Sequence, residues 1–139
     1  RCAIEDDMQD LHPRIRDADF LIFASPINCG TVTAIMKTFL ERTVWVHARP
    51  GKRPLHGCPE PRPKKKKRAI IILSAGIVPP ALRMFCDDAT ALIKSNCKGS
   101  YNARVVGSLY AGACEKKGVD PYLDKAFNLG RRLTSKPAG

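Results

Sequence analysis

Residues 20–24 read Phe20-Leu21-Ile22-Phe23-Ala24, and residues 69–73 read Ala69-Ile70-Ile71-Ile72-Leu73. Each is an unbroken apolar run of the length of one strand. Strands buried on both faces have this pattern, which is typical of parallel sheets covered by helices. Residues 103–111 predict a third strand. These runs indicate the fold class before any helix is considered.

Helical patterns alternate with the three predicted strands. We predict helices over residues 6–16, from Thr31 as N-cap to about Arg42, from Pro79-Pro80 to about Ser95, and from Asp120-Pro121 to about Leu133. Acidic residues crowd the first turn of the first helix, where the helix dipole favours them. Strict alternation of strands and helices predicts an α/β fold with a parallel sheet and helices on both faces.

Ligands of open parallel sheets bind beyond the carboxyl ends of the strands. Here these ends are residues 25–31, residues 74–78 and the region of Gly112. The first two are turns of small, polar or glycine residues. Their backbone amides could hold a flat, electron-poor ring with carbonyl and imide groups.

The chain has 139 residues, of which 44 % are hydrophobic and 27 % charged, which suits one globular domain over residues 1–139. No apolar run approaches the roughly 18 residues that a membrane-spanning helix needs. The first residue is Arg1 rather than Met, so we expect a chain that is processed, trimmed or shown in part.

The formal net charge is +11, and most of the excess lies in residues 49–68, with nine basic residues and one acid, Glu60. Five prolines in this window exclude a helix or a central strand. It is predicted to be a solvated loop ending in Lys64-Lys65-Lys66-Lys67-Arg68 that interrupts the domain. Phosphates could bind it by counterion release, but it lacks the interleaved aromatic residues that stack on bases.

The six cysteines are at positions 2, 29, 58, 86, 97 and 114, without a CxxC pair. We therefore expect free thiols in a reducing cytoplasm and no metal site. The three histidines belong to no recognisable triad and are predicted to lie on the surface (His12, His47 and His56). The acids Asp6 and Asp7 are read as partners of the helix dipole, and Lys37 and Arg42 as solvent-facing or interface residues.

Three segments in order resemble the NAD(P)H-dependent FMN reductases, in the branch related to iron–sulfur flavoproteins. They are Cys2-Ala3-Ile4-Glu5-Asp6-Asp7-Met8, then residues 18–27 with Ser25-Pro26-Ile27, then Met36-Lys37-Thr38-Phe39-Leu40-Glu41-Arg42. The resemblance implies a flavodoxin-like three-layer sandwich and bound FMN. Hydride would pass from NAD(P)H to the flavin, and electrons would pass on to a small-molecule or protein acceptor. The resemblance also implies a homodimer or higher oligomer.

The flavin carries the chemistry in such a protein, so we nominate no catalytic residue. The resemblance places residues 25–30 against the isoalloxazine ring and residues 74–76 near its pyrimidine edge. The candidate cofactor-binding residues are Ser25, Pro26, Ile27, Asn28, Cys29, Gly30, Thr31, Ser74, Ala75 and Gly76.

Two departures from the family pattern stand out. Asn28 occupies the place of a tyrosine that would cover one face of the ring. The phosphate loop that the family places upstream of Asp6-Asp7-Met8 is absent, as are cysteines for an iron–sulfur cluster. We therefore expect a domain lacking its first strands, with the apolar edge of residues 20–24 open to other residues or to another chain.

Two functions follow from these observations. One is a flavin-dependent oxidoreductase that uses FMN. The alternative is a non-catalytic flavodoxin-like module whose basic loop, residues 49–68, contacts an anionic partner or nucleic acid.

Overall fold

A four-stranded sheet forms the centre of the molecule, in the strand order β2-β1-β5-β6. The computed structural model describes residues 5–51 and 58–135. The strands are β1 (Phe20–Asn28), β2 (Thr31–Val32), β5 (Lys67–Ser74) and β6 (Ala103–Ala111). β5 pairs in parallel with both β1 and β6, and β2 pairs antiparallel with the end of β1. The α/β class and the three parallel strands are thus confirmed.

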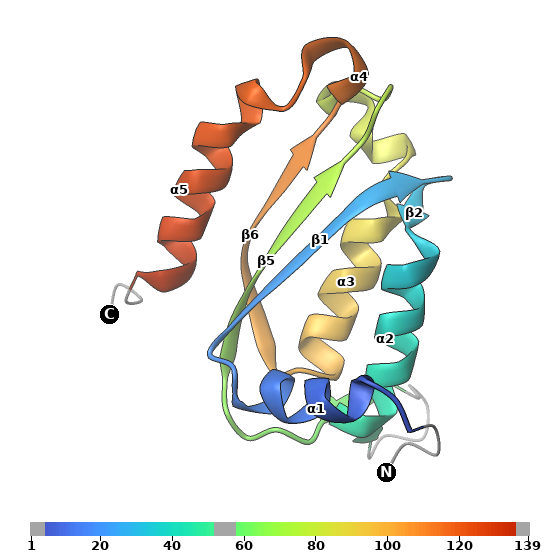
Figure 1. Ribbon diagram of the computed structural model, residues 1–139, viewed down its shortest axis with the longest axis vertical. Helices are drawn as coiled ribbons and strands as arrows, with labels where there is room; N and C mark the ends of the chain where they lie inside the picture. Colours follow the sequence, from blue (N-terminus) through green and yellow to red (C-terminus); the bar gives the residue numbers. More distant parts are fainter. Residues whose placement is uncertain (1–4, 52–57, 136–139) are drawn as a thin grey trace.

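Helices cover both faces of the sheet (Figure 1). α2 (Ala34–His47) and α3 (Asp88–Gly99) lie on one face, and α5 (Leu123–Thr134) lies on the other. Alternate residues of β5 supply the two cores: Ala69, Ile71 and Leu73 pack toward α2 and α3, whereas Ile70 packs toward α5 with Leu129 and Leu133. This burial on both faces explains the unbroken apolar run in β5.

Shorter elements complete the chain. They are α1 (Met8–Asp17), α4 (Cys114–Lys117), the 3-10 helices η1 (Pro80–Phe85) and η2 (Asp120–Tyr122), and a two-stranded ribbon of β3 (Ala48–Pro50) and β4 (Pro59–Pro61). Gly107 of β6 allows α5 to lie close to the sheet, since a Cβ there would lie 2.4 Å from Leu129 Cδ1. No helix in the described ranges has both the length and the apolar character needed to cross a bilayer.

The second predicted helix is displaced at both ends. Thr31 was expected as its N-cap, but Thr31 belongs to β2, and the cap is Thr33, whose hydroxyl accepts from the backbone N–H of Met36 at 3.3 Å. The helix continues to His47, beyond the predicted end at Arg42. The predicted turn over residues 25–30 is also wrong in part, because β1 runs to Asn28 and only Cys29 and Gly30 form the bend.

Two further predictions are corrected. The basic segment is not a loop throughout, because Lys67 and Arg68 belong to β5 and residues 48–50 and 59–61 form the small ribbon; residues 52–57 lie outside the described part. The helix predicted from Pro79-Pro80 to Ser95 is two elements, since the 3-10 helix η1 ends at Phe85 and α3 begins at Asp88. The carboxylate of Asp87 caps α3 by accepting from the N–H of Thr90 at 2.9 Å.

Candidate cofactor site at the carboxyl edge of the sheet

The carboxyl ends of three parallel strands meet at one edge of the sheet. Pro26 of β1 is in register with Ser74 of β5, and Ser74 is in register with Ala111 of β6. The segments that follow β1 and β5 therefore begin side by side, as the sequence predicted. In Figure 1 the segment after β5 lies near α4, whereas the segment after β1 turns back as β2. We call the surface formed by residues 26–30 and 74–77 the carboxyl shelf.

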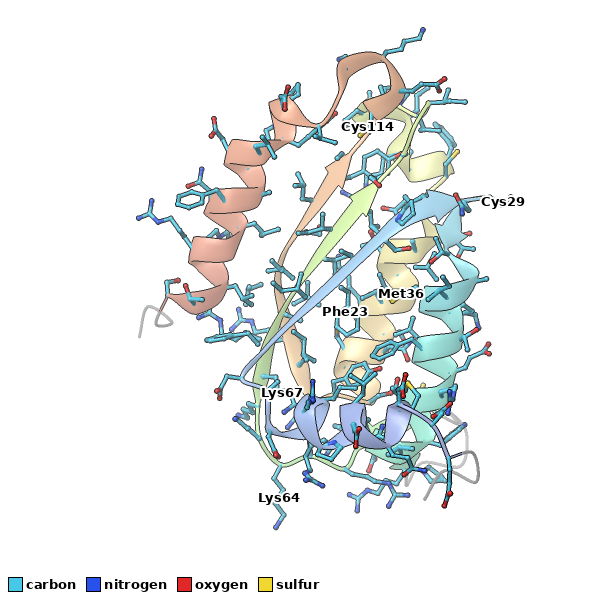
Figure 2. All side chains as sticks on the ribbon, in the orientation of Figure 1. Phe23, Cys29, Met36, Lys64, Lys67 and Cys114 are labelled. Carbon is cyan, nitrogen blue, oxygen red and sulfur yellow. The ribbon has the colours of Figure 1, made fainter. Side chains whose placement is uncertain are left out.

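The first half of the shelf is a tight hairpin between β1 and β2. Cys29 and Gly30 have φ values of 49° and 81°, the left-handed pair that a two-residue turn requires. Cys29 is exposed at the tip (Figure 2). The carbonyl of Gly30 accepts a hydrogen bond of 2.8 Å from the N–H of Asp88, so the start of α3 holds the hairpin in place.

Ser25 supports this hairpin from below rather than facing outward. Its side chain is buried, and its hydroxyl donates to the carbonyl of Pro26 at 2.8 Å and accepts from the N–H of Thr33 at 3.2 Å. The same hydroxyl thus joins the end of β1 to the cap of α2. Of the predicted residues in this half, Pro26, Asn28 and Cys29 are exposed, whereas Ile27, Gly30 and Thr31 are half-buried.

The second half of the shelf is clamped from the far side by α4. The buried Ala75 donates its N–H to the carbonyl of Ala111 at 2.8 Å. The N–H groups of Cys114 and Glu115 donate to the carbonyls of Ala75 and Gly76, both at 3.0 Å. The small size of Gly76 leaves open space on its outer side, because a Cβ at this position would meet only Glu115 Oε2, at 3.9 Å.

The shelf offers backbone donors to a ligand. The N–H groups of Cys29, Gly30, Gly76 and Ile77 donate to no other backbone group within the described residues. Carbonyl and imide oxygens and nitrogens on the edge of a planar ring need such donors. The donor chemistry of the shelf therefore fits a flavin ring, and Asn28 adds a side-chain amide that can both donate and accept.

Three side chains near the shelf were not predicted from the sequence: Tyr110, Arg83 and Glu115. The Tyr110 hydroxyl donates to the carbonyl of Val78 at 3.3 Å, and the Arg83 guanidinium lies 5.4 Å from the centre of the Tyr110 ring. Burial raises the pKa of Tyr110. Asp87 and Thr90 hold the Arg83 side chain at 2.7 and 3.0 Å. Tyr110 and Glu115 lie just before and just after the end of the predicted third strand, whereas Arg83 lies inside the helix predicted from Pro79-Pro80 and had no such signal.

Charged residues discussed in the sequence analysis form ion pairs away from the shelf. Asp6 forms a two-pronged ion pair with Arg42, at 2.5 and 2.8 Å, and the Arg42 guanidinium lowers the pKa of the Asp6 carboxyl. Lys37 is exposed and pairs with Glu41 at 2.5 Å. No group of three or more metal-ligating side chains occurs within residues 5–51 and 58–135.

The prediction of surface histidines is wrong for His47. Its side chain is buried, 4 % exposed, because α2 extends five residues farther than predicted and carries it beneath α1. Its Nε2 lies 3.3 Å from Nδ1 of the half-buried His12. His56 lies outside the described residues.

Comparison with solved structures shows the fold. A putative quinone reductase from Klebsiella pneumoniae superposes with a TM-score of 0.64 and 21 % identity, over 93 % of this chain and 54 % of its own. A flavone reductase gives 0.69 and 19 % identity, over 95 % of this chain and 48 % of its own. An apo NADH:FMN oxidoreductase gives a TM-score of 0.55 and 20 % identity, over 96 % of this chain and 64 % of its own. The chain thus spans about half the length of the first two proteins.

The sequence comparison supplies the family. No curated protein sequence matches the chain significantly. Residues 1–78, however, match the family model of NADPH-dependent FMN reductases. The match includes β1, β5 and both halves of the carboxyl shelf, so the segments that point to a flavin are inside it. The chain therefore belongs to the NADPH-dependent FMN reductase family.

Proposed function

We propose that this chain binds FMN through its ring at the carboxyl shelf and takes part in electron transfer from NAD(P)H to a further acceptor. The observation that carries the proposal is that two neighbouring parallel strands end at paired positions, Pro26 and Ser74, and that the turns which follow, at residues 29–30 and 76–77, carry N–H groups that donate to no backbone group among the described residues. When bound, FMN supplies the two-electron chemistry.

The residues of the shelf would bind and orient the ring. Backbone donors of Gly76 and Ile77 suit the carbonyl and imide edge, and the exposed amide of Asn28 can hydrogen-bond at the ring edge. The family pattern has an aromatic residue at this place, so Asn28 leaves one ring face without a stacking partner. We expect a weaker hold on the ring than an aromatic residue would give.

The acceptor and the assembly are part of the same proposal. The names of the similar structures suggest planar carbonyl compounds such as quinones or flavones as acceptors. We further propose a homodimer or higher oligomer that works in the cytoplasm.

The test is a spectroscopic titration of the full chain with FMN, followed by an assay of NADPH and NADH oxidation with a quinone as acceptor. We expect the visible flavin bands to shift on binding and both measurements to depend on the shelf. Gly76→Val should fill the open space beside Gly76. Its side chain would clash with the flavin ring, so we expect binding of FMN to weaken roughly tenfold or more. Gly130→Val, in equally open space on α5, is the matched control and should leave binding unchanged.

An unshifted flavin spectrum at millimolar FMN, together with no NAD(P)H oxidation, would contradict the proposal. That result would favour the alternative of a non-catalytic flavodoxin-like module. Equal weakening by Gly76→Val and Gly130→Val would move the FMN site away from the shelf.

A further inference from the structure

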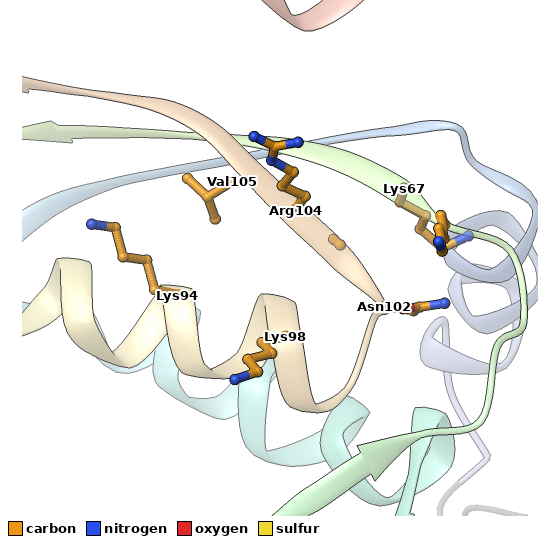
Figure 3. A pocket seen from close by; sticks show the side chains of 8 residues that line it. Lys67, Lys94, Lys98, Asn102, Arg104 and Val105 are labelled. Carbon is orange, nitrogen blue, oxygen red and sulfur yellow. The ribbon is translucent and has the colours of Figure 1, made fainter. Parts of the chain in front are cut away.

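A cavity lies at the opposite end of the sheet from the carboxyl shelf. Its volume is about 460 Å³, and it lies between α3 and the first residues of β5 and β6 (Figure 3). The lining residues that matter here are Lys66, Lys94, Lys98, Asn102, Arg104 and Val105. We call this cavity the basic pocket. Sheet strands separate it from the shelf, so the proposed FMN ring does not account for its charge.

The basic pocket has an excess of positive charge without internal compensation. Among the residues that the structure describes, no acidic side chain lines it. Lys66, Lys94 and Lys98 are exposed, and none of them forms an ion pair within the described residues, whereas the neighbouring Lys65 pairs with Asp19 at 2.7 Å. Lys94 and Lys98 are one helical turn apart on α3, a spacing at which like charges destabilise the helix. A bound anion would remove this repulsion.

The loop that carries Lys66 is fixed rather than free. Asn102, with a left-handed φ of 53°, donates from its side-chain amide to the carbonyls of Pro63, Lys64 and Lys65 at 3.1–3.3 Å. The backbone N–H of Lys67 in turn donates to the carbonyl of Asn102 at 3.0 Å. This clamp holds the lysine run against the start of β6. Two chain segments far apart in sequence thus contribute cations to one cavity.

The chemistry of the lining selects among anions. Val105 and the stem of Lys94 give the pocket an apolar wall, but its described lining contains no aromatic residue. Stacking on nucleobases therefore has no platform here. The guanidinium of Arg104 extends to the other side of β6 from α3, where it adds charge at the rim rather than inside. The pocket is concave and of the size that small ligands occupy.

We propose that the basic pocket binds a small anion with adjacent phosphate groups, held by Lys66, Lys94 and Lys98. This site is independent of the FMN ring site. Lysine ammonium groups act as point charges toward phosphate oxygens, and three of them suit a chain of phosphates better than a single carboxylate. The binding is therefore expected to weaken as salt is added.

The test is calorimetric titration of the full chain with inorganic triphosphate at low and physiological salt. We expect one site per chain, and a loss of affinity of roughly tenfold or more in the double variant Lys94→Glu/Lys98→Glu. The matched control is Lys125→Glu/Arg131→Glu on α5, which changes the net charge by the same amount far from the pocket. It should bind triphosphate within about twofold of the original chain, because contact rather than overall charge sets the affinity. Circular dichroism of both variants confirms that each is folded.

Three results would overturn the proposal. Equal weakening in both double variants would show only attraction to the net positive charge. Failure of triphosphate to bind at millimolar concentration and low salt would leave the lysines as a solvated surface. Tight binding of single-stranded DNA that involves Lys94 and Lys98, without binding of triphosphate, would indicate a nucleic-acid surface instead.

Discussion

The ammonium group of Lys67 lies 2.9 Å from the carbonyl oxygen of Ala18, at the point where the α1–β1 connection crosses the start of β5. The same group donates to the carbonyl of Arg16 at 2.5 Å. The side chain is almost fully buried, at 2 % exposure, and burial lowers its pKa. One cation therefore caps the end of α1 and joins it to the central strand, which places Lys67 in the core rather than in the solvated basic segment.

Replacing Lys67 by methionine should destabilise the protein. The apolar stem is kept, but two carbonyl oxygens lose their donor, at a loss of about 1–3 kcal/mol in the free energy of unfolding. Urea denaturation followed by circular dichroism measures it. Lys64→Met, which changes an exposed lysine of the same run, should stay within about 0.5 kcal/mol of the original chain. Equal effects of the two substitutions would contradict the buried role of Lys67.

The hydroxyl of Thr43 and the phenol of Tyr101 form a hydrogen bond inside the core, between α2 and the segment before β6. Both side chains are at most 1 % exposed, and burial raises the pKa of Tyr101 to about 12. Thr43→Val leaves the phenol without this partner and should lower the free energy of unfolding by about 1–3 kcal/mol. Thr38→Val, on the exposed side of the same helix, is the control. A loss no larger than that of Thr38→Val would exclude a structural role for this bond.

His47 should make the protein less stable in mild acid. Burial, together with His12, Lys67 and Arg16, lowers its pKa from 6.5 to about 4. Because the unfolded chain binds the proton more readily, stability is fully present above about pH 6.5 and decreases as the pH falls toward 4. Between pH 7 and pH 5 the decrease from this group is about 2 kcal/mol. Denaturation of the original chain and of His47→Gln at both pH values measures it. An unchanged pH slope in His47→Gln would show that His47 is not responsible.

The open edge of β1 should promote self-association. Ile22 is 61 % exposed, and beside it Leu21, Met36 and Phe39 line an apolar groove of about 440 Å³ along α2. Among the described residues β1 pairs on this side only through Ile27 and Asn28. Sedimentation velocity at rising concentration should show larger species for the original chain and fewer for Ile22→Lys, since charge on a strand edge opposes pairing. Ile77→Lys, at a residue that is 79 % exposed and outside the groove, should associate like the original chain. Identical sedimentation of all three would exclude this edge as a contact surface.

The apolar runs at residues 20–24 and 69–73 were sufficient to predict two parallel strands. The expected burial on both faces holds for β5 but is wrong for β1, where Phe20 is 42 % and Ile22 is 61 % exposed. The same argument placed residues 26–30 beside residues 74–77, which the register of Pro26 with Ser74 confirms. The family motifs at residues 2–42 agree with the family match over residues 1–78. These features depend on local sequence and on the general rules of parallel sheets.

Other features depended on contacts that the local sequence does not show. The pattern of prolines and lysines predicted a loop up to Arg68. Lys67 nevertheless lies in the core, because backbone carbonyls of the α1–β1 connection accept hydrogen bonds from its buried ammonium group. Thr31 looked like a helix cap, yet the left-handed bend at Cys29 and Gly30 turns the chain back as β2 and moves the cap to Thr33. The contribution of α4 to the shelf, through the carbonyls of Ala75 and Gly76, had no sequence pattern at all.

The most direct test of the central claim is a titration of the isotope-labelled chain with riboflavin, followed by amide chemical shifts in two-dimensional NMR spectra. Riboflavin carries the ring without the phosphate, so it isolates the proposed ring contact from any anion binding. We expect the largest shifts at the amides of Cys29, Gly30, Gly76 and Ile77. Shifts confined to the region of Lys94 and Lys98, or none at saturating riboflavin, would contradict a flavin shelf at the carboxyl edge of the sheet.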